Sequence, residues 1–452
     1  MENDQEDSNS SEIPEAYSNW NNPSFSWSDV ILSFLTSYFL DFSALDNQTL
    51  DPNSEEAANI LDKLRTKLNG MSSGYLGRVA VEKWVKAAGC GRLAEYSGTI
   101  PVQKDILNKW EILSSDKDDY QLPDCISTRE HVPVLVRFPA TLMSAEERDN
   151  AKVLDYSGCL EVKELDLTTF APGVPFMIQF HGGGMIMGTP HRDTFLNATA
   201  ELVSNFLEEN ANVADPPDIV TISVDYGLAP ELPFPAGIID ALSVVEFLMK
   251  DNPNRRLHLM GESAGANLSV VAALESFRRY PGQIRSVQSQ CPMLNPAGDS
   301  LCYYMNQNAF PATDFLRWCW RAYLGLEAPK SNGSDSNSTS REEALRNGSN
   351  HDAWEEWRKK HPKSLQRLID PGCDLPQCLN IKNAPKIIFE VNQGDPMFED
   401  GKKLAEALQQ EQANVLLFAD KGLHCSMGGT HDKAGHKKAM QFWSEAIFAS
   451  DD

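Results

Sequence analysis

A serine between two glycines is the residue of this chain whose setting best suits covalent chemistry. Gly261-Glu262-Ser263-Ala264-Gly265 follows the apolar run LHLM and precedes the helical run ANLSVVAALESF. A sharp turn from strand to helix would raise the Ser263 hydroxyl above a sheet, and small neighbours are required because a Cβ at either glycine would collide across the turn. The positive end of the following helix would lie behind that hydroxyl. A glycine-rich turn without chemistry is the alternative that the pattern alone leaves open.

Three consecutive glycines after another apolar run could supply the second part of such a site. His181-Gly182-Gly183-Gly184 comes directly after VPFMIQF. Glycines let backbone N–H groups point into a cavity without side chains in the way, as an oxyanion hole requires. The candidate donors to the oxyanion of a tetrahedral intermediate are the N–H groups of Gly182, Gly183, Gly184 and Ala264. Because both signals follow expected strands, we interpret them as one catalytic site.

A serine hydroxyl needs a base to become nucleophilic, and that base needs an acid to orient it. Among the nine histidines, His424 is the best placed, because it follows the apolar run VLLF where a loop would leave a sheet. Asp395 follows IIFEV in the same way. The weaker alternatives are two acidic residues that open a helix, where they favour its dipole, and two histidines expected on the solvated surface of the last helix: Glu399, Asp400, His431 and His436.

The elements around these residues predict an α/β fold with a mainly parallel central sheet. Short apolar runs alternate with helical stretches, which is typical of buried parallel strands flanked by helices on both faces. The expected strands are 174–180, 219–224, 257–260, 387–391 and 415–418, and the expected helices are 193–209, 238–250, 264–279, 399–412 and 433–449. Alternation in HVPVLVRF (131–138) indicates an antiparallel strand at an edge of the sheet.

The chain divides into three expected parts. Residues 1–25 are acidic and rich in Ser and Asn, which predicts a mobile tail. Residues 26–128 are expected to be a mostly helical N-terminal cap region, because helical periodicity runs through 27–113. Residues 129–452 are the expected catalytic domain, with a polar, mobile surface insertion at 327–350.

Composition limits the partners and the location. The chain of 452 residues has 64 acidic against 40 basic residues and a formal charge of −24, which disfavours binding to nucleic acid and to anionic lipid. The acidic start does not resemble a secretory leader, and the run VILSFLTSYFL (30–40) is too short to span a bilayer. The nine cysteines lack metal-binding spacing, which indicates free thiols. We expect a cytoplasmic protein with no membrane insertion and no metal ion.

Taken together, the motifs resemble the hormone-sensitive-lipase family of α/β-hydrolases. HGGG, VDYGLAPELPFPAGIIDA, GESAGANLS, GDPMFEDG and GLH occur in the order typical of that family, over about residues 170 to 445. The resemblance implies an α/β-hydrolase fold with a helical cap, no cofactor, and a serine esterase whose substrates are small-molecule esters of short to medium acyl chains. It also implies Ser263 as the nucleophile, Asp395 as the orienting acid and His424 as the base.

Two departures from the family pattern concern the neighbourhood of the site. The usual Tyr-Arg-Leu-Ala-Pro is Tyr226-Gly227-Leu228-Ala229-Pro230 here, so another group must do what that arginine does. Glu262 stands where Asp or Thr is commoner, and it either bonds a nearby loop or is only tolerated beside Ser263. The alternatives to an esterase are a non-catalytic small-molecule receptor on the same fold, a deacetylase and a true lipase. A homodimer is left open.

Overall fold

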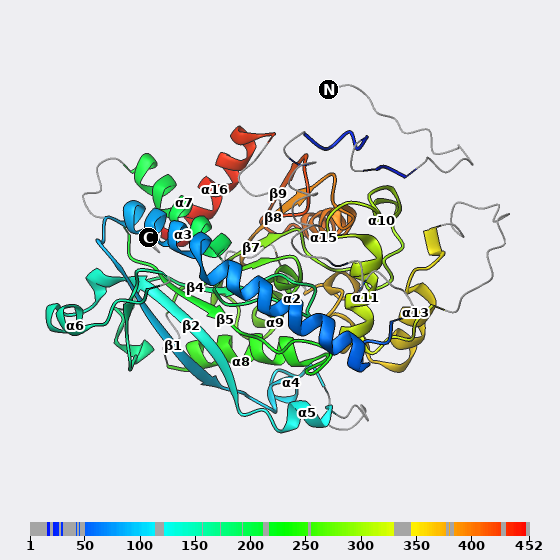
Figure 1. Cartoon of the computed structure of the whole chain (residues 1–452), viewed down its shortest axis with the longest axis horizontal. Coiled ribbons are helices and arrows are strands. Elements are labelled where there is room, and N and C mark those ends of the chain that lie inside the picture. Colours follow the sequence, from blue (N-terminus) through cyan, green and yellow to red (C-terminus); the bar gives the residue numbers. More distant parts are fainter. Residues whose placement is uncertain are drawn as a thin grey trace.

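The computed structural model describes most of the chain and contains, within the described part, one nine-stranded sheet (Figure 1). The described residues are 16–18, 21–26, 29, 42, 45, 50–113, 122–155, 157–171, 173–191, 193–210, 217–251, 255–329, 345–376, 379, 384–425 and 431–448. The strand order is β3-β1-β2-β5-β4-β6-β7-β8-β9. The run 30–40 lies outside the described residues.

The six strands from β4 onward are parallel, which confirms the expected mainly parallel sheet. They are β4 (Phe176–Phe180), β5 (Val220–Val224), β6 (Leu257–Glu262), β7 (Ile284–Gln290), β8 (Lys386–Asn392) and β9 (Val415–Asp420). The five strands expected from apolar runs correspond to β4, β5, β6, β8 and β9. The carboxyl ends of parallel strands meet at one edge of a sheet, and the loops leaving that edge carry the predicted site residues.

Three further strands extend the sheet beyond β5. They are β1 (Leu93–Pro101), β2 (His131–Pro139) and the short β3 (Leu160–Glu161). Strand β2 pairs antiparallel with both β1 and β5, so its expected direction is confirmed but its expected place at an edge is wrong. The prediction of helical structure through 27–113 is wrong for β1, which belongs to the sheet of the expected catalytic domain.

Helices cover both faces of the sheet, and the five expected helices are confirmed within two residues at each end. Helices α3, α7 and α16 lie on one side of the sheet, and α8 and α9 lie on the other (Figure 1). In the described part of the chain, the helices of eight or more residues are α2 (Glu55–Ser73), α3 (Tyr75–Ala88), α7 (Asp193–Glu209), α8 (Ala236–Asp251), α9 (Ala264–Arg279), α11 (Thr313–Leu324), α13 (His351–Lys360), α15 (Phe398–Gln410) and α16 (Lys433–Phe448). The shorter ones are α4 (Ile106–Lys109), α5 (Asp124–Ser127), α6 (Ala145–Asn150), α10 (Leu301–Met305) and α14 (Lys363–Gln366).

Two apolar cores lie on opposite faces of the sheet, because successive side chains of a strand point to opposite sides. Ile178 and Ile387 belong to the core that α8, α9 and α15 share, whereas their neighbours Met177 and Ile388 belong to the core under α3, α7 and α16. A strand that is apolar on both faces reads as a continuous apolar run. This is why β4 and β8 could be recognised from the sequence.

Strand β7 could not be recognised in that way, because it is polar. Its sequence is IRSVQSQ, and Ser286, Gln288 and Gln290 are nevertheless buried. Ser286 Oγ lies 2.8 Å from Nδ1 of His258, and the Gln288 amide donates to Glu390 Oε1 at 2.6 Å. Buried polar side chains are tolerated when they find such partners. The partners lie on neighbouring strands, so the sequence of β7 alone gives no indication of them.

Part of the expected mobile tail packs against loops of the sheet. The Tyr17 N–H donates to the carbonyl of Met305 at 2.8 Å, and the Ser24 carbonyl accepts the N–H of Gly422 at 2.8 Å. The buried Asn22 amide donates to the Asn306 side chain at 2.9 Å. The prediction of a mobile tail is therefore wrong for these residues. Residues 1–15, 19 and 20 lie outside the described part of the chain.

The polar insertion is shorter than expected. Its last residue, Asn350, is buried and donates from its side chain to the carbonyls of Arg317 and Pro296 at 2.8 and 3.1 Å. Those bonds fix Asn350 between α11 and the loop after β7, so the expected surface insertion does not extend to 350. Residues 330–344 lie outside the described residues.

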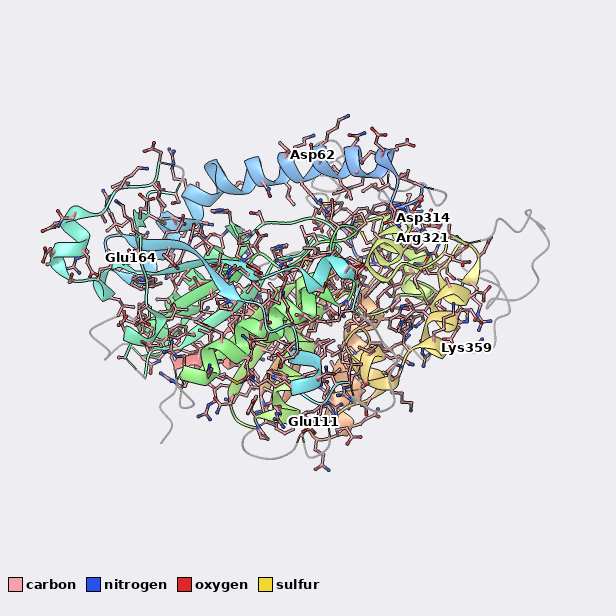
Figure 2. All side chains as sticks on the ribbon, turned by 90° about the horizontal axis from the view of Figure 1, so that it is seen from below. Asp62, Glu111, Glu164, Asp314, Arg321 and Lys359 are labelled. Carbon is pink, nitrogen blue, oxygen red and sulfur yellow. The ribbon has the colours of Figure 1, made fainter. Side chains whose placement is uncertain are left out.

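Helix α2 runs along the outside of the molecule, with Asp62 on its exposed side (Figure 2). Its opposite side contributes Leu61, Leu64 and Leu68 to the core, which gives the helix its amphipathic pattern. Its role as a cap stays a prediction. In the described part of the chain, no helix combines the length and the apolar character that crossing a bilayer would need.

Candidate active site

Ser263 lies at the junction between β6 and α9 and has a strained backbone. Its φ is 55° and its ψ is −116°, values that a residue with a Cβ rarely adopts. The turn is close-packed: a Cβ at Gly261 would overlap the Gly265 carbonyl, and a Cβ at Gly265 would overlap the Phe180 carbonyl of β4. The glycines on both sides therefore meet a steric need, as the sequence analysis expects of this turn. The turn aims Ser263 at the carboxyl edge of the sheet.

Asp395 and His424 are brought together by the loops that follow β8 and β9. Nδ1 of His424 lies 2.6 Å from Oδ2 of Asp395, and the other carboxylate oxygen accepts the Met397 N–H at 2.9 Å. A carboxylate only accepts, so Nδ1 carries the proton and Nε2 is the nitrogen left to act as a base. Asp395 is fully buried, and the His424 side chain is 8% exposed. The two residues are thus arranged as an acid that orients an imidazole.

The charge state of His424 follows from these contacts. Burial of the ring opposes protonation, but the charge of Asp395 and its hydrogen bond outweigh burial, with a further contribution from Cys291. Together they raise the pKa of His424 to about 10. A protonated imidazole is therefore the stable form at neutral pH, and the unprotonated base becomes more abundant as the pH rises.

The segments that hold Ser263 and His424 both contact the last residue of β7. The Gln290 carbonyl accepts the N–H of Ser263 at 2.8 Å, and it lies 3.9 Å from Sγ of Cys425, the residue after His424. Among the described residues, no hydrogen bond joins the Ser263 hydroxyl to His424. Nε2 of His424 instead lies 3.5 Å from Cys425 Sγ. In enzymes without substrate, the contact between nucleophile and base is often long and tightens when substrate binds.

The glycine loop after β4 lies directly beside Ser263. A Cβ at Gly182 would be 3.2 Å from Cβ of Ser263. Gly183 and Gly184 have φ values of 120° and 64°, a region that favours glycine. The N–H groups of Gly183, Gly184 and Ala264 have no acceptor among the described residues, whereas the Gly182 N–H donates to Glu262 Oε1 at 3.3 Å. Of the four predicted donors, Gly182 is therefore already engaged.

Glu262 connects the serine turn to the glycine loop. It is buried, and its two carboxylate oxygens accept different donors: the Gly182 N–H at 3.3 Å and the Thr194 hydroxyl at 3.1 Å. Thr194 belongs to α7, so the carboxylate joins three segments that end beside Ser263. Of the two interpretations of Glu262, these contacts favour the one in which it bonds a nearby loop.

Arg129 occupies the space that a side chain at Gly227 would take. A Cβ at Gly227 would lie 2.7 Å from Nη1 of Arg129, and Nη2 of Arg129 is 3.1 Å from the carboxylate of Asp240. Asp240 also accepts the Gly227 N–H at 2.7 Å. Burial raises the pKa of Asp240 to about 7, although Arg129 and this backbone bond lower it. An arginine from a different segment of the chain thus lies against Gly227, the position where the expected motif has its own arginine.

The weaker candidates for acid and base have other partners. Glu399 pairs with Lys403 at 3.0 Å, and Asp400 accepts the Tyr303 hydroxyl at 3.1 Å. His431 lies 3.2 Å from Asp29. The prediction that His436 is a solvated surface residue is wrong, because it is buried and lies 2.8 Å from Glu201.

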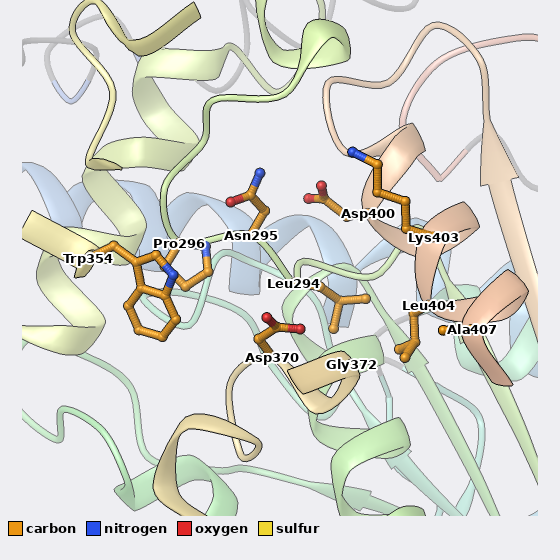
Figure 3. Close-up of a pocket in the computed structure, with 10 residues that line it drawn as sticks. All are labelled: Leu294, Asn295, Pro296, Trp354, Asp370, Gly372, Asp400, Lys403, Leu404 and Ala407. Atoms are coloured by element: carbon orange, nitrogen blue, oxygen red, sulfur yellow. The ribbon is translucent and has the colours of Figure 1, made fainter. Parts of the chain in front are cut away.

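A cavity of about 320 Å³ lies beside α15, with Trp354 on one side and Lys403 and Leu404 on the other (Figure 3). Asp370 and Asp400 also line it, and burial raises the pKa of both carboxyl groups. Ser263, Asp395 and His424 are not among its lining residues. It is therefore a different hollow from the one the reaction would need.

The fold and the arrangement at the strand ends define the class: the protein has the α/β-hydrolase fold. Residues 177–333 match the sequence model of a family described as alpha/beta hydrolase fold. The structure of a protein described as "Bacterial Heroin Esterase" has a TM-score of 0.50 with this chain at 15% identity, covering 88% of this chain and 98% of that one. This likeness shows the shared fold, and the expected α/β-hydrolase architecture is confirmed.

Relatives similar in sequence include proteins named as a carboxylesterase and a lipase. "Probable carboxylesterase 3" of Arabidopsis thaliana is 31% identical over 115 residues, which are 24% of this chain and 33% of that protein. Hormone-sensitive lipase of Mus musculus is 26% identical over 217 residues, which are 45% of this chain and 26% of that protein. The resemblance to the hormone-sensitive-lipase family is confirmed. The chain spans a third or less of the length of these relatives.

The sequence analysis missed three residues near the site. Cys291 and Cys425 approach His424 from the ends of β7 and β9, and Arg129 lies against Gly227. The glycine at position 227, where the family motif has an arginine, was the sign that another arginine could lie nearby. It does not indicate which of the other arginines this would be. Two isolated cysteines give no signal until the sheet brings them together.

Proposed function

We propose that the chain is a carboxylic ester hydrolase that acts on esters of short to medium acyl chains through an acyl-enzyme at Ser263. One observation carries the proposal. The strained turn that holds Ser263 lies beside the free N–H groups of the glycine loop and shares the Gln290 carbonyl with the loop that holds the His424–Asp395 pair. The similarity to carboxylesterases and to hormone-sensitive lipase supports the same reaction class.

In the proposed reaction, Nε2 of His424 takes the proton of Ser263 as Oγ attacks the ester carbonyl. The N–H groups of Gly183, Gly184 and Ala264 stabilise the oxyanion of the tetrahedral intermediate. His424 then gives the proton to the leaving alcohol, which departs and leaves an ester of Ser263. Water hydrolyses that acyl-enzyme by the same route, while Asp395 keeps the tautomer of His424 and stabilises its charged form.

Replacement of the nucleophile tests the proposal. Ser263→Ala should lower kcat/KM for p-nitrophenyl butyrate by at least about 10³-fold and abolish labelling by a fluorophosphonate probe. Ser269→Ala is a matched control, because Ser269 is a buried serine of α9 that donates only to the Ala266 carbonyl among the described residues. Activity of Ser263→Ala near that of the wild type would refute the assignment.

The same labelling experiment separates an esterase from a receptor on this fold, since a receptor would not react with the probe. Rates across a series of acyl lengths, with an amide analogue and a tributyrin emulsion included, separate an esterase from a deacetylase and from a true lipase. The cytoplasmic location, the absence of nucleic-acid partners and the homodimer stay predictions.

A further inference from the structure

Three sulfur and nitrogen atoms meet beside the carboxyl ends of β7 and β9. They belong to Cys291, His424 and Cys425, and each ligating atom lies within 4.8 Å of the other two. The Cys425 N–H donates to Cys291 Sγ at 3.2 Å, and Nε2 of His424 lies 3.5 Å from Cys425 Sγ. Cys291 is buried, and neither cysteine is in a disulfide. The contact between the two cysteine residues brings groups 134 positions apart into one cluster.

These separations suit a thiophilic metal ion. With Zn–S and Zn–N lengths of about 2.3 and 2.05 Å, tetrahedral coordination places a sulfur and a nitrogen ligand about 3.6 Å apart and two sulfurs about 3.8 Å apart. The observed distance of 3.5 Å between His424 and Cys425 agrees with the first value. Small rotations of two thiol side chains would adjust the rest, because every ligating atom is already within 4.8 Å.

The partner of the other imidazole nitrogen also suits a metal ligand. A histidine that binds a metal commonly donates its second ring N–H to a carboxylate, which fixes the tautomer and orients the ring. Nδ1 of His424 makes this contact with Asp395 at 2.6 Å, so Nε2 is the nitrogen available for a metal. Apart from those small rotations of the thiol side chains, the cluster already supplies two sulfur ligands, one nitrogen ligand and a supporting carboxylate.

We propose that Cys291, His424 and Cys425 form a binding site for Zn²⁺ or a similar thiophilic divalent ion, and that its occupancy inhibits hydrolysis. Binding forms two bonds from the metal to thiolate and one to imidazole without any change of oxidation state. It releases to solvent the two thiol protons and, where the imidazole is protonated, the proton of Nε2 as well. Two thiolates neutralise the charge of the ion, which lowers the desolvation cost of binding it at a buried site. Hard ions such as Mg²⁺ prefer oxygen ligands and should not bind.

The inhibitory part of this proposal rests on the proposed function. Nε2 of His424 is the atom that takes the proton of Ser263, and a metal ion bound there blocks the transfer. The binding part does not depend on catalysis, because Ser263 is not a ligand. Direct measurement of binding therefore tests the site even if the chain hydrolyses no ester.

Co²⁺ is the probe for binding, since thiolate ligands give it charge-transfer absorption and tetrahedral coordination gives intense visible bands. Wild-type protein, Ser263→Ala and Cys373→Ser should all bind an equimolar amount of Co²⁺ with both signatures, and Zn²⁺ should displace it. Cys425→Ser and Cys291→Ser should bind Co²⁺ at least about tenfold more weakly and lose charge-transfer intensity. Cys373 is the matched control, because it is another partly exposed free cysteine.

Hydrolysis of p-nitrophenyl butyrate is the second measurement. Zn²⁺ should inhibit wild type and Cys373→Ser, EDTA should restore the activity, and Cys425→Ser should need at least about tenfold more Zn²⁺ for the same inhibition. Circular dichroism checks that each variant is folded. If Cys291→Ser fails to fold because the residue is buried, Cys425→Ser and Cys425→Ala still decide the result.

The outcomes are distinct. Equal Co²⁺ binding by wild type and Cys425→Ser, or no binding by the wild type, overturns the site. Binding with both signatures but with full activity at saturating Zn²⁺ overturns the inhibition and leaves the site. Binding in a protein that hydrolyses no ester and takes no fluorophosphonate supports the site and refutes the proposed function.

Discussion

In the proposed reaction the chemistry depends on His424, and the surroundings of this residue set its charge. Asp395 at 2.6 Å and the neighbouring Cys291 favour the protonated ring more than burial disfavours it, which raises the pKa of His424 to about 10. Only the unprotonated ring can accept the proton of Ser263. The residue that orients the base therefore also reduces the fraction of base present at neutral pH.

This balance predicts the pH dependence of the reaction. As the pH rises through the pKa of His424, the unprotonated fraction increases, so kcat/KM should rise with an inflection well above about 6.5, the ordinary histidine value. Asp395→Asn removes the charge that raises the pKa, so its much lower residual activity should level off at a lower pH. The measurement is a profile of kcat/KM against pH for both proteins.

A second Asp–His pair provides the control for that profile. Asp299 Oδ2 lies 2.6 Å from Nδ1 of His351, the same distance as in the pair at the site. Asp299→Asn should leave the inflection unchanged. An inflection at or below about 6.5 in the wild type would show that His424 is not the base in this state.

Substitutions at Arg129 and Gly227 should be energetically coupled, and a double substitution tests this. Arg129→Ala leaves the buried Asp240 carboxylate without its ion pair, so the free energy of unfolding should fall by about 3 kcal/mol. Gly227→Arg in that background places a guanidinium in the vacated space and should restore part of the loss, whereas in the wild type it should destabilise. Denaturant unfolding of the four proteins measures the coupling.

The direction in which the stability loss of Arg129→Ala changes with pH offers a second check on the interaction of Arg129 with Asp240. The pKa of Asp240 is raised to about 7, so its carboxylate takes up a proton at mildly acidic pH. The neutral carboxyl group no longer depends on the positive charge of Arg129. The loss in Arg129→Ala should be larger at alkaline than at mildly acidic pH. Additive effects of the substitutions at Arg129 and Gly227 would contradict the expected coupling.

At the scale of elements, the site depends on how closely β6, α9 and β4 approach. A Cβ at Gly265 on α9 would overlap the Phe180 carbonyl at the end of β4, and Ser263 lies at the junction between β6 and α9. Backbone cannot yield as a flexible side chain can, so the junction is intolerant of added volume. The strain at Ser263 persists because these three elements fix the turn.

Two Gly→Ala substitutions test that statement. Gly265→Ala should lower the free energy of unfolding by about 3 kcal/mol and reduce fluorophosphonate labelling, because the new Cβ overlaps backbone. Gly70→Ala, at an exposed position of α2 with nothing within 4 Å of the new Cβ, should raise the free energy of unfolding by about 0.5 to 1 kcal/mol. Thermal unfolding and labelling measure both. Equal stability of the two variants would contradict the close packing at the junction.

At the scale of the whole molecule, the N-terminal region is fastened onto the loops that surround the site. Arg65 of α2 donates to the carbonyls of Ile186 and Ala229 at 2.8 and 2.9 Å and pairs with Glu231 at 2.8 Å. Ile186 follows the glycine loop, and Ala229 lies in the loop after β5. The N–H of Gly422, two residues before His424, is held by Ser24. Segments far from the site in the sequence thus hold its loops.

Arg65→Ala tests the contribution of α2. Loss of these bonds should lower the free energy of unfolding by about 1 to 2 kcal/mol and raise KM for ester substrates. Lys67→Ala on the exposed side of the same helix is the control and should change neither. Thermal unfolding and steady-state kinetics are the measurements. Unchanged stability of Arg65→Ala would show that α2 is held by its apolar side alone.

The sequence by itself was sufficient to predict the strands, helices and turns that are determined by residues close together in the chain. Strands β4 and β8 are apolar on both faces and therefore appear as continuous apolar runs. Helices α7 and α9 have the predicted ends, because burial of a helix face leaves a helical period in the sequence. The turn at Ser263 and the glycine loop could be recognised for the same reason, since their steric needs concern adjacent residues. The position of Asp395 and His424 at strand ends was also enough to predict that they lie together, as the 2.6 Å contact shows, whereas their catalytic roles stay a proposal.

The tertiary structure decided everything that depends on residues distant in the chain. The polar strand β7 is stable because Ser286 and Gln288 find partners on neighbouring strands, and Arg129 lies against Gly227 because the fold brings these two segments together. Cys291 and Cys425 become one cluster only when β7 and β9 end at the same edge. Packing brings groups that are distant in the chain within a few ångströms of each other. The spacing of residues along the sequence does not give these distances in space.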